Sequence, residues 1–231
     1  MTVLCIVAHP DDEVLGVGGT LARHAEEGED VHICILSDGV TSRYDDTNAA
    51  TEEIEDRRGN ARQACDALGA TVNFYGFPDN RFDTVPLLDI VQTIEKEIKR
   101  CDPDIVYTHH YGDLNVDHEL ACQATVTATR PLQSSNIEQV LAFETLSASE
   151  WSTPASDNAF QPTMFVDVSN HLDRKIAALT KYENELRASP HPRTTETVRD
   201  NAAVWGQRAA STPQNHSNCF VPFDVTRERI L

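Results

Sequence analysis

Residues 3–22 read VLCIVAHPDDEVLGVGGTLA. The apolar run at the start of this stretch is followed at once by one imidazole and three carboxyl groups, those of His9, Asp11, Asp12 and Glu13. A short, unbroken apolar run predicts a strand that is buried on both faces. Three acidic groups side by side repel one another unless a cation or a hydrogen-bond network holds them. The stretch therefore predicts either a metal site at the end of a buried strand or an acidic turn that caps the next helix.

Short apolar runs alternate with helical segments along the rest of the chain. Strands are expected at 3–8, 31–36, 71–75, 105–109, 140–143, 164–168 and 219–223, and helices at 19–27, 50–68, 87–99, 118–129, 171–186 and 195–208. Apolar strands separated by helices predict a parallel sheet that is covered on both faces. We therefore expect an α/β fold, Rossmann-like, with a mostly parallel sheet between two layers of helices. We expect one domain over residues 1–231.

The composition argues against several classes of function. The formal net charge is -18, and no stretch gathers Lys and Arg, which disfavours nucleic acid and anionic membranes as partners. No apolar run approaches the roughly 20 residues that span a bilayer, and the first residues lack the basic start and long apolar core of a signal peptide. A cytoplasmic protein is expected. The six cysteines show no CxxC spacing, so no disulfide framework is expected.

A second polar stretch follows the strand expected at 105–109, and it reads HHYGDLNVDH over residues 109–118. Ligands of open α/β sheets collect at the carboxyl ends of the strands. Two separate strand-end loops thus deliver His9, Asp12 and His118 to one edge of the sheet. Two histidines and a carboxylate with an open fourth position are typical of catalytic zinc.

These motifs resemble those of the LmbE/PIG-L family of zinc-dependent deacetylases, which act on N-acetylglucosaminyl groups. The first motif, AHPDDEVLGVGGTL, is the most specific. The resemblance extends over nearly the whole chain, through ALGATVNFYGFPDNRF, YGDLNVDH, FETLSASEW, KIAALTKYENEL and SPHPRTTE.

The resemblance implies a role for each residue of the two motifs. His9, Asp12 and His118 would ligate Zn²⁺ or another divalent metal. Asp11 would be the general base that takes a proton from the metal-activated water and returns it to the leaving amine. Asp117 resembles the acid that orients the active-site histidines of the family.

Two positions stay open. Many members of the family carry a second histidine where this chain has Asn115. An amide can still donate to an oxyanion, but it lacks the charge of an imidazolium, which His109 or His110 would have to supply. Glu13 either bonds to the second ring nitrogen of His9 or caps the following helix.

Five residues are candidate substrate contacts: Arg58, Asp79, Arg81, His110 and His191. Asp79 matches a family position that contacts sugar hydroxyls, although a Pro-Asp-Asn turn would explain it equally. Arg58 could instead be an exposed helical arginine. His191 lies in a segment that in oligomeric relatives reaches toward a neighbouring subunit, so the resemblance also suggests a homo-oligomer, a trimer or hexamer.

The preferred function is therefore zinc-dependent removal of the acetyl group from an N-acetylglucosamine-type sugar or conjugate. The alternatives are an amidase of a thiol–sugar conjugate and a carbohydrate-binding relative weakened by Asn115. A metal-free nucleotide-binding domain is disfavoured because carboxylates stand where phosphates need backbone amides. Gly16, Gly18 and Gly19 also lack the third glycine of the dinucleotide fingerprint, and more plausibly allow a tight turn and close packing of the helix.

Overall fold

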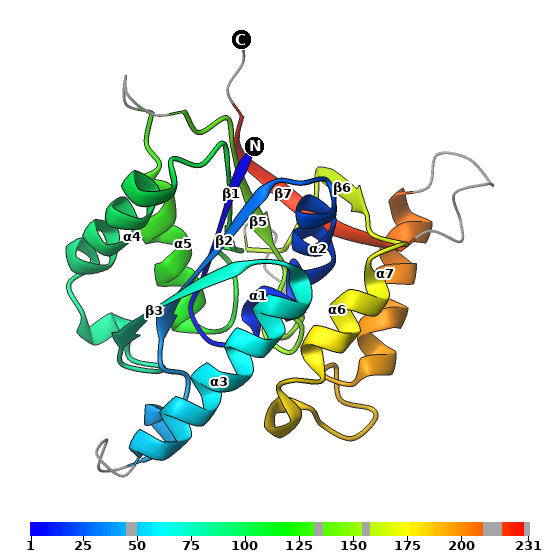
Figure 1. Ribbon diagram of the computed structural model, residues 1–231, viewed down its shortest axis with the longest axis horizontal. Coiled ribbons are helices and arrows are strands. Elements are labelled where there is room, and N and C mark those ends of the chain that lie inside the picture. The colour runs from blue at the N-terminus through cyan, green and yellow to red at the C-terminus, as the bar shows by residue number, and fades with distance from the viewer. Residues whose placement is uncertain (45–49, 132–135, 154–157, 210–218, 229–231) are drawn as a thin grey trace.

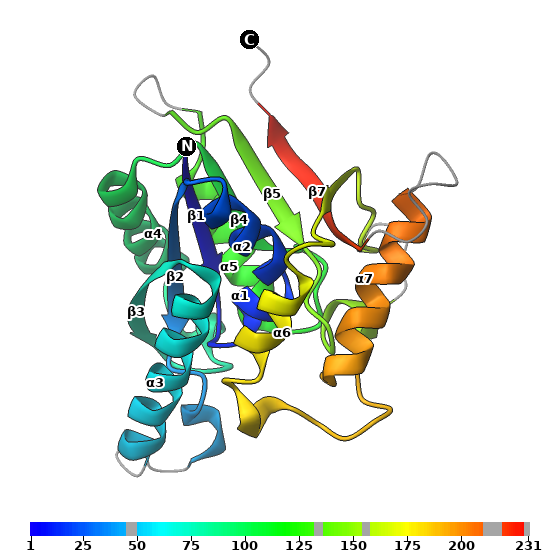
Figure 2. The ribbon, with the colours of Figure 1, turned by 45° about the vertical axis from the view of Figure 1, so that its right-hand side comes forward.

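A mixed seven-stranded sheet in the order β3-β2-β1-β4-β5-β7-β6 forms the centre of the molecule (Figures 1 and 2). The computed structural model describes residues 1–44, 50–131, 136–153, 158–209 and 219–228. The strands are β1 (Thr2–Val7), β2 (Asp30–Ser37), β3 (Thr71–Phe77), β4 (Ile105–His109), β5 (Gln139–Phe143), β6 (Met164–Asp167) and β7 (Phe220–Glu228). The first five run parallel, and β7 pairs antiparallel with both β5 and β6. The mostly parallel sheet is confirmed.

Helices cover both faces of the sheet, as predicted. They are α1 (Asp12–Leu15), α2 (Gly18–Glu26), α3 (Thr51–Leu68), α4 (Leu87–Cys101), α5 (Val116–Ala128), α6 (Leu172–Leu179) and α7 (Thr195–Ala209). On one face Ile90 of α4 and Ala124 of α5 belong to the same apolar cluster as Leu4 of β1. On the other face, where α2, α3 and α6 lie (Figure 2), Leu68 and Val3 share a second apolar cluster. Burial on both faces explains why β1 carries no polar residue after Thr2.

The helix predicted over 171–186 is shorter than expected. Helix α6 ends at Leu179, and a 3₁₀ turn follows at Glu183–Glu185. The N–H groups of Lys181 and Tyr182 bond three residues back, to Ala178 and Leu179, which tightens the chain as 3₁₀ geometry does. This turn buries Tyr182 and Glu185.

The topology determines where a site can form. The strand order reverses direction between β1 and β4, and open α/β sheets bind ligands at such a point. Val3 pairs with Ile105 and Cys5 with Tyr107, so the loops that follow β1 and β4 leave the sheet side by side. The segment after β1 begins with His9, and the segment after β4 leads into α5.

Gly16 allows the first helices to pack closely on the sheet. A Cβ atom at this position would lie 2.3 Å from the ring of Phe143 on β5, which no side chain could tolerate. The predicted packing role of this glycine is confirmed, and no phosphate needs to be invoked for it.

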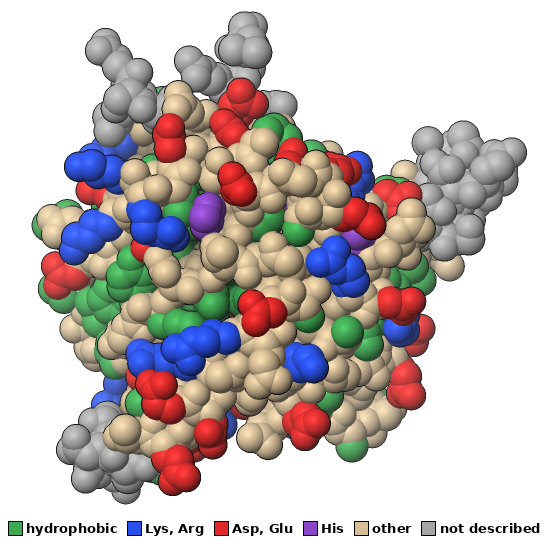
Figure 3. Space-filling view, viewed as in Figure 1, with side chains coloured by type: hydrophobic (Ala, Val, Ile, Leu, Met, Phe, Trp, Pro, Cys, Tyr) green, Lys and Arg blue, Asp and Glu red, His purple; other side chains and the backbone are tan. Residues whose placement is uncertain are grey.

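The face of the molecule drawn in Figure 3 carries charged side chains of both signs. Acidic and basic side chains are interspersed over this face. Among the described helices, none combines the length and the apolar character that a membrane crossing requires. All six cysteines are free.

Candidate active site

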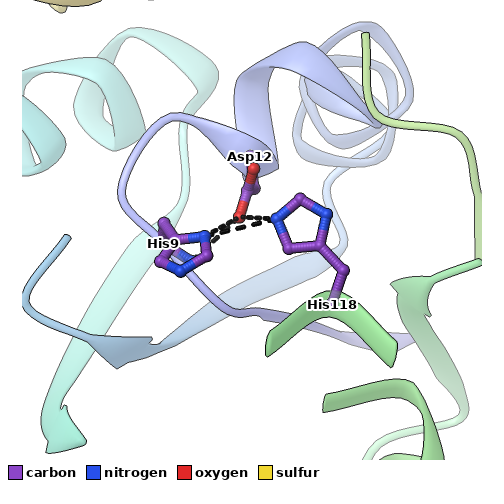
Figure 4. Close-up of side chains that lie close together, drawn as sticks. All are labelled: His9, Asp12 and His118. Atoms are coloured by element: carbon purple, nitrogen blue, oxygen red, sulfur yellow. Dashed lines mark hydrogen bonds and ion pairs between the residues drawn. The ribbon is translucent and has the colours of Figure 1, made fainter. Parts of the chain in front are cut away.

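Three side chains from different segments converge at the carboxyl edge of β1 and β4. His9 lies in the loop after β1, Asp12 begins α1, and His118 lies in the first turn of α5; Figure 4 shows their side chains pointing toward one another. Asp12 Oδ2 lies 3.3 Å from His9 Nδ1 and 3.2 Å from His118 Nε2. The two ring nitrogens are 3.2 Å apart.

This donor set fits a metal ion. All three residues are buried, and their donor atoms are close enough together for one ion to contact all of them. Tetrahedral ligands at about 2.0–2.1 Å from zinc lie about 3.3 Å from one another, which matches the three separations. His9, Asp12 and His118, the three residues predicted from the sequence, could therefore hold a metal ion here.

Carboxylates stand behind both histidines. Asp117 Oδ2 lies 2.9 Å from His9 Nε2, and Asp113 Oδ1 lies 3.1 Å from His118 Nδ1. The Asp117 carboxylate is itself held by the backbone N–H groups of Asn80 and Phe82, which donate to it. Such an arrangement fixes the orientation of metal-ligating imidazoles.

The carboxylates make this region favour positive charge. Although burial opposes the charged imidazole, hydrogen bonds with Asp117 and Asp12 raise the pKa of His9 to about 10. Burial likewise opposes the charged form of His118, yet Asp12 and Asp113 raise its pKa to about 9. A divalent cation would supply the positive charge that these carboxylates favour and would leave both rings neutral.

His9 also contacts a third carboxylate, that of Asp79. Its Nε2 lies 3.3 Å from Asp79 Oδ1, so His9, Asp79 and Asp117 form a second group of possible ligands. Because Asp117 already accepts two backbone N–H groups, we regard this group as the outer support of His9. Asp79 is 3% exposed and also accepts from the backbone and hydroxyl of Ser42.

Asp11 presents a carboxylate beside the donor set. It precedes α1 with φ 114° and ψ -26°, a conformation that is strained for a residue with a side chain. Its Oδ2 accepts a hydrogen bond from Arg193 Nη1 at 2.9 Å. Burial raises the pKa of Asp11, while the guanidinium of Arg193 acts in the opposite direction.

The contacts of Glu13 differ in part from both expected roles, a bond to His9 and a cap on the following helix. Its Oε2 accepts the backbone N–H of Asp11 at 3.0 Å, and its Oε1 accepts the hydroxyl of Tyr182 at 2.5 Å. It does not bond to His9. The capping alternative is the nearer one, because Asp11 is the residue that precedes the helix.

His109 does not supply the missing positive charge. Its Nε2 accepts the backbone N–H of Ala8, and its Nδ1 lies 3.1 Å from Thr145 Oγ1. Burial lowers the pKa of His109 to about 3, so the ring is neutral. It stacks on His118 with centroids 3.9 Å apart, and it supports that ligand by packing.

A cavity of about 550 Å³ opens over these residues. Its lining includes two metal-site histidines and Asp11, and it continues over residues from six further segments. The lining residues are His9, Asp11, Gly39, Ser42, Arg43, Arg57, Asp79, Asn80, Leu114, Asn115, Val116, His118, Ser147, Ala148, Trp151, Glu185 and Arg193.

The cavity has a charged wall and an apolar rim. On the wall, Glu185 lies 2.8 Å from both Arg43 and Arg57 and 3.5 Å from Arg193. Leu114, Val116 and Trp151 are exposed large apolar residues along the rim. Such a site can hold a polar molecule with several hydroxyl or anionic groups.

Two predicted arginine contacts do not reach the cavity. Arg58 pairs with Glu55 on its own helix and covers the ring of Phe74. The preceding residue, Arg57, lines the cavity instead and is 6% exposed, because neighbouring helical residues point about 100° apart. Arg81 lies outside the cavity lining and is exposed.

The two histidine candidates also lie outside the cavity lining. His110 is buried, with its Nε2 2.8 Å from the carbonyl of Asn158. His191 accepts the backbone N–H of Arg193 and packs its ring against Trp151, with centroids 5.5 Å apart. His191 thus lies behind the rim. Its predicted reach toward a neighbouring subunit stays a prediction.

Asn115 lies at the cavity edge and caps α5. Its side-chain oxygen accepts the backbone N–H of Asp117, and its Nδ2 donates to Asn80 Oδ1 at 3.1 Å. This capping role was missed, although Asn before a helix that bears an acid in its first turn is a known signal.

Four further charged or aromatic residues of the cavity were not predicted, namely Arg43, Trp151, Glu185 and Arg193. Trp151 and Glu185 lie within segments that carry the family resemblance, which was the one available signal. Their positions depend on loops between elements, whose paths local sequence patterns do not define.

Comparison with known proteins finds relatives that include deacetylases. One relative, described as an uncharacterized deacetylase YaiS of Escherichia coli, is 32% identical over 189 residues, which covers 79% of this chain and 90% of that protein. A 4-oxalmesaconate hydratase of Pseudomonas putida is 29% identical over 77% of this chain and 71% of its own length. The diacetylchitobiose deacetylase of Thermococcus kodakarensis is 25% identical over 80% of this chain and 70% of its own length.

A solved structure shares the fold. The N,N'-diacetylchitobiose deacetylase from Pyrococcus horikoshii matches with a TM-score of 0.75 at 17% identity, over 97% of this chain and 83% of that one. Residues 4–129, which include both motifs, match the family of the GlcNAc-PI de-N-acetylase. The chain belongs to this PIG-L family of deacetylases.

Proposed function

We propose that this protein is a zinc-dependent hydrolase that removes the acetyl group from an N-acetylglucosamine-type sugar or sugar conjugate. The observation that carries the proposal is the convergence of His9, Asp12 and His118, with Asp11 beside them in the same cavity. Membership of a deacetylase family and relatives that act on acetylated sugars support it.

Zinc suits this donor set because two imidazoles and one carboxylate leave a position for water or substrate. When bound, the ion would lower the pKa of water to about 7 and polarise the acetamide carbonyl. Asp11 would accept a proton from the attacking water and then pass it to the amine that leaves. Asp117 and Asp113 would keep both ligand rings oriented.

The cavity supports a sugar-sized substrate. Its volume of about 550 Å³ lies within the usual range for small-molecule sites. Asp79 would accept hydrogen bonds from sugar hydroxyls, and Arg57 and Arg193 would donate to oxygen atoms of the substrate. Leu114 and Trp151 would contact the apolar face of a sugar ring or an attached group. A cytoplasmic location and a trimeric or hexameric assembly stay predictions.

A second candidate is the hydration of an unsaturated carboxylic acid. The observation that favours it is the wall of three arginines, Arg43, Arg57 and Arg193, since guanidinium groups bind carboxylates in pairs of hydrogen bonds. The similarity to a 4-oxalmesaconate hydratase points the same way. We place it second because the family and the other relatives reported above are deacetylases.

Metal analysis and a substrate panel test the proposal together. We expect about one zinc per chain in the purified protein, as a three-ligand site implies, and loss of that zinc in His118→Ala. The zinc-loaded protein is then assayed for acetate release from N-acetylglucosamine, diacetylchitobiose, a nucleotide sugar and an N-acetylglucosaminyl inositol. Asp11→Asn should keep the zinc but lower kcat by about 10²–10⁴-fold.

Other outcomes discriminate between the alternatives. Failure to bind zinc or any other divalent metal after reconstitution would exclude every metal-dependent hydrolase. Sugar binding without acetate release would identify a carbohydrate-binding relative, and cleavage of other sugar-linked amides an amidase. If the protein adds water to an unsaturated tricarboxylate, as measured by the absorbance of that substrate, it is a hydratase.

A further inference from the structure

We propose that Glu13 and Tyr182 are positioning residues that hold Asp11 in the conformation its reaction requires. The proposal rests on the proposed function, in which Asp11 moves the proton. Neither Glu13 nor Tyr182 belongs to the cavity lining, so both would act through Asp11 and not on the substrate.

The backbone of Asp11 needs an external support. Its φ of 114° lies in a region that is strained for a residue with a side chain, and surrounding contacts must maintain such a conformation. Glu13 supplies one of these contacts by accepting the N–H of Asp11 at 3.0 Å. The carbonyl of Asp11 accepts from Val14 and Leu15 at 3.0 and 2.9 Å. Both backbone polar groups of the proposed base are thus held.

Glu13 is an unusual choice for a purely structural contact. It is fully buried, and it forms no ion pair with a cationic side chain in the described part of the chain. Burying a carboxylate without a cation is costly. Accepting the N–H of the residue that precedes the four-residue helix α1 does not require this cost, because the neutral amide of Gln can accept the same group.

Tyr182 completes the arrangement from a distant part of the sequence. Its hydroxyl donates to Glu13 Oε1 at 2.5 Å, across 169 residues of sequence. Tyr182 is itself fully buried and lies in the turn that ends α6 early. That turn therefore places a hydroxyl under the loop of the proposed base.

Tyr182→Phe is the most direct test, because it removes one oxygen atom and keeps the buried ring. Tyr75→Phe is a matched control. The Tyr75 hydroxyl also donates to a buried carboxylate, that of Glu97, and neither Tyr75 nor Glu97 lines the cavity. Zinc content, unfolding temperature, KM and kcat are measured for both variants, with amide hydrogen exchange of Asp11 followed by NMR.

We expect Tyr182→Phe to lower kcat roughly ten- to a hundredfold, with KM and zinc content unchanged and faster exchange of the Asp11 amide. Tyr75→Phe should match the wild type in kcat and in Asp11 exchange. Glu13→Gln, which retains an oxygen acceptor for Asp11, should keep more activity than Glu13→Ala at equal zinc content.

The proposal is overturned if Tyr182→Phe leaves kcat and Asp11 exchange unchanged. A loss of kcat that tracks loss of zinc or global unfolding also overturns it, because that result shows a merely structural role. If the wild type releases no acetate, the proposed function fails, and Asp11 exchange alone then decides whether Tyr182 and Glu13 hold this residue.

Discussion

Arg193 donates a hydrogen bond from Nη1 to Asp11 Oδ2 across 2.9 Å, although 182 residues separate them in sequence. The same guanidinium nitrogen lies 3.5 Å from Glu185, and its Nε donates to Ser147 Oγ. Arg193 thus connects the proposed base to the charged wall of the cavity. The contact has a consequence for the pH at which the base works.

We predict that Arg193→Gln shifts the acidic limb of the kcat/KM profile to higher pH. Burial raises the pKa of Asp11, and Arg193 counteracts this shift. Without the guanidinium the carboxyl group binds its proton up to a higher pH, and a protonated carboxyl cannot act as a base. Arg130→Gln is the control, since Arg130 is exposed, lies outside the cavity lining and pairs with Glu95. If the acidic limb of the kcat/KM profile is unchanged in Arg193→Gln, Asp11 is not the general base.

Arg57 and Arg58 offer a matched pair of substitutions. Arg57 lines the cavity and is buried, whereas Arg58 pairs with Glu55. We expect Arg57→Ala to raise KM about tenfold, which corresponds to about 1.4 kcal/mol of binding. Arg58→Ala should change KM little, because a partly exposed ion pair contributes less than about 1 kcal/mol. Steady-state kinetics on the best acetylated sugar decide the matter; equal KM values in the two variants would count against the placement of Arg57.

Much of the fold could be predicted because its strands are unusually uniform. A strand such as β1, which is apolar at every position after Thr2 and is followed by a helix, has few alternatives to a central parallel position. The end of α6 could not be predicted in the same way. Its apolar periodicity continues through Leu186, and the turn forms because Tyr182 and Glu185 find partners far away in sequence.

The residues of the site likewise fall into those that the sequence predicts and those that it does not. His9, Asp12 and His118 lie directly after strands or at the start of a helix, where topology alone brings them to one edge. Whether Arg57 or Arg58 faces the cavity depends on which face of α3 packs inward. The acidic, polar sequence of α3 has no clear apolar stripe that would identify this face. Arg193 reaches Asp11 from a loop, whose path depends on tertiary contacts.

Substitutions of Asn115 distinguish a helix-capping role of its side chain from a catalytic role. Replacing an N-cap residue by Ala costs about 1 kcal/mol of stability, and loss of an oxyanion donor lowers kcat by about 10²–10³-fold. Because Asn115 holds the N–H of Asp117 and its amide donates to Asn80, we expect Asn115→Ala to lower the free energy of unfolding by about 1 kcal/mol and kcat less than tenfold. Asn115→Ser, which keeps a capping oxygen, should recover the stability. A hundredfold fall of kcat in both variants would instead assign Asn115 to the oxyanion.

We predict that Lys175 makes the stability of the protein depend on pH. The side chain is 5% exposed and donates from Nζ to the carbonyl of Leu15 at 2.8 Å and to that of Gly16 at 3.3 Å, at the end of α1. Burial lowers the pKa of Lys175 to about 8 from 10.5, although Glu144 acts in the opposite direction. The unfolded chain therefore binds this proton more tightly than the folded chain.

The sign of the effect follows from that difference. Between about pH 8 and 10.5 the unfolded state holds more protons at this residue, so the contribution of Lys175 to stability rises with pH. Relative to Lys175→Met, the wild type should gain at most about 3 kcal/mol across this interval. Urea unfolding at several pH values measures the difference, in which the titration of other groups cancels. Lys181→Met, at an exposed lysine near the end of α6, should show no such trend; a flat difference for Lys175→Met would mean that its amine is already neutral or is solvated in the folded protein.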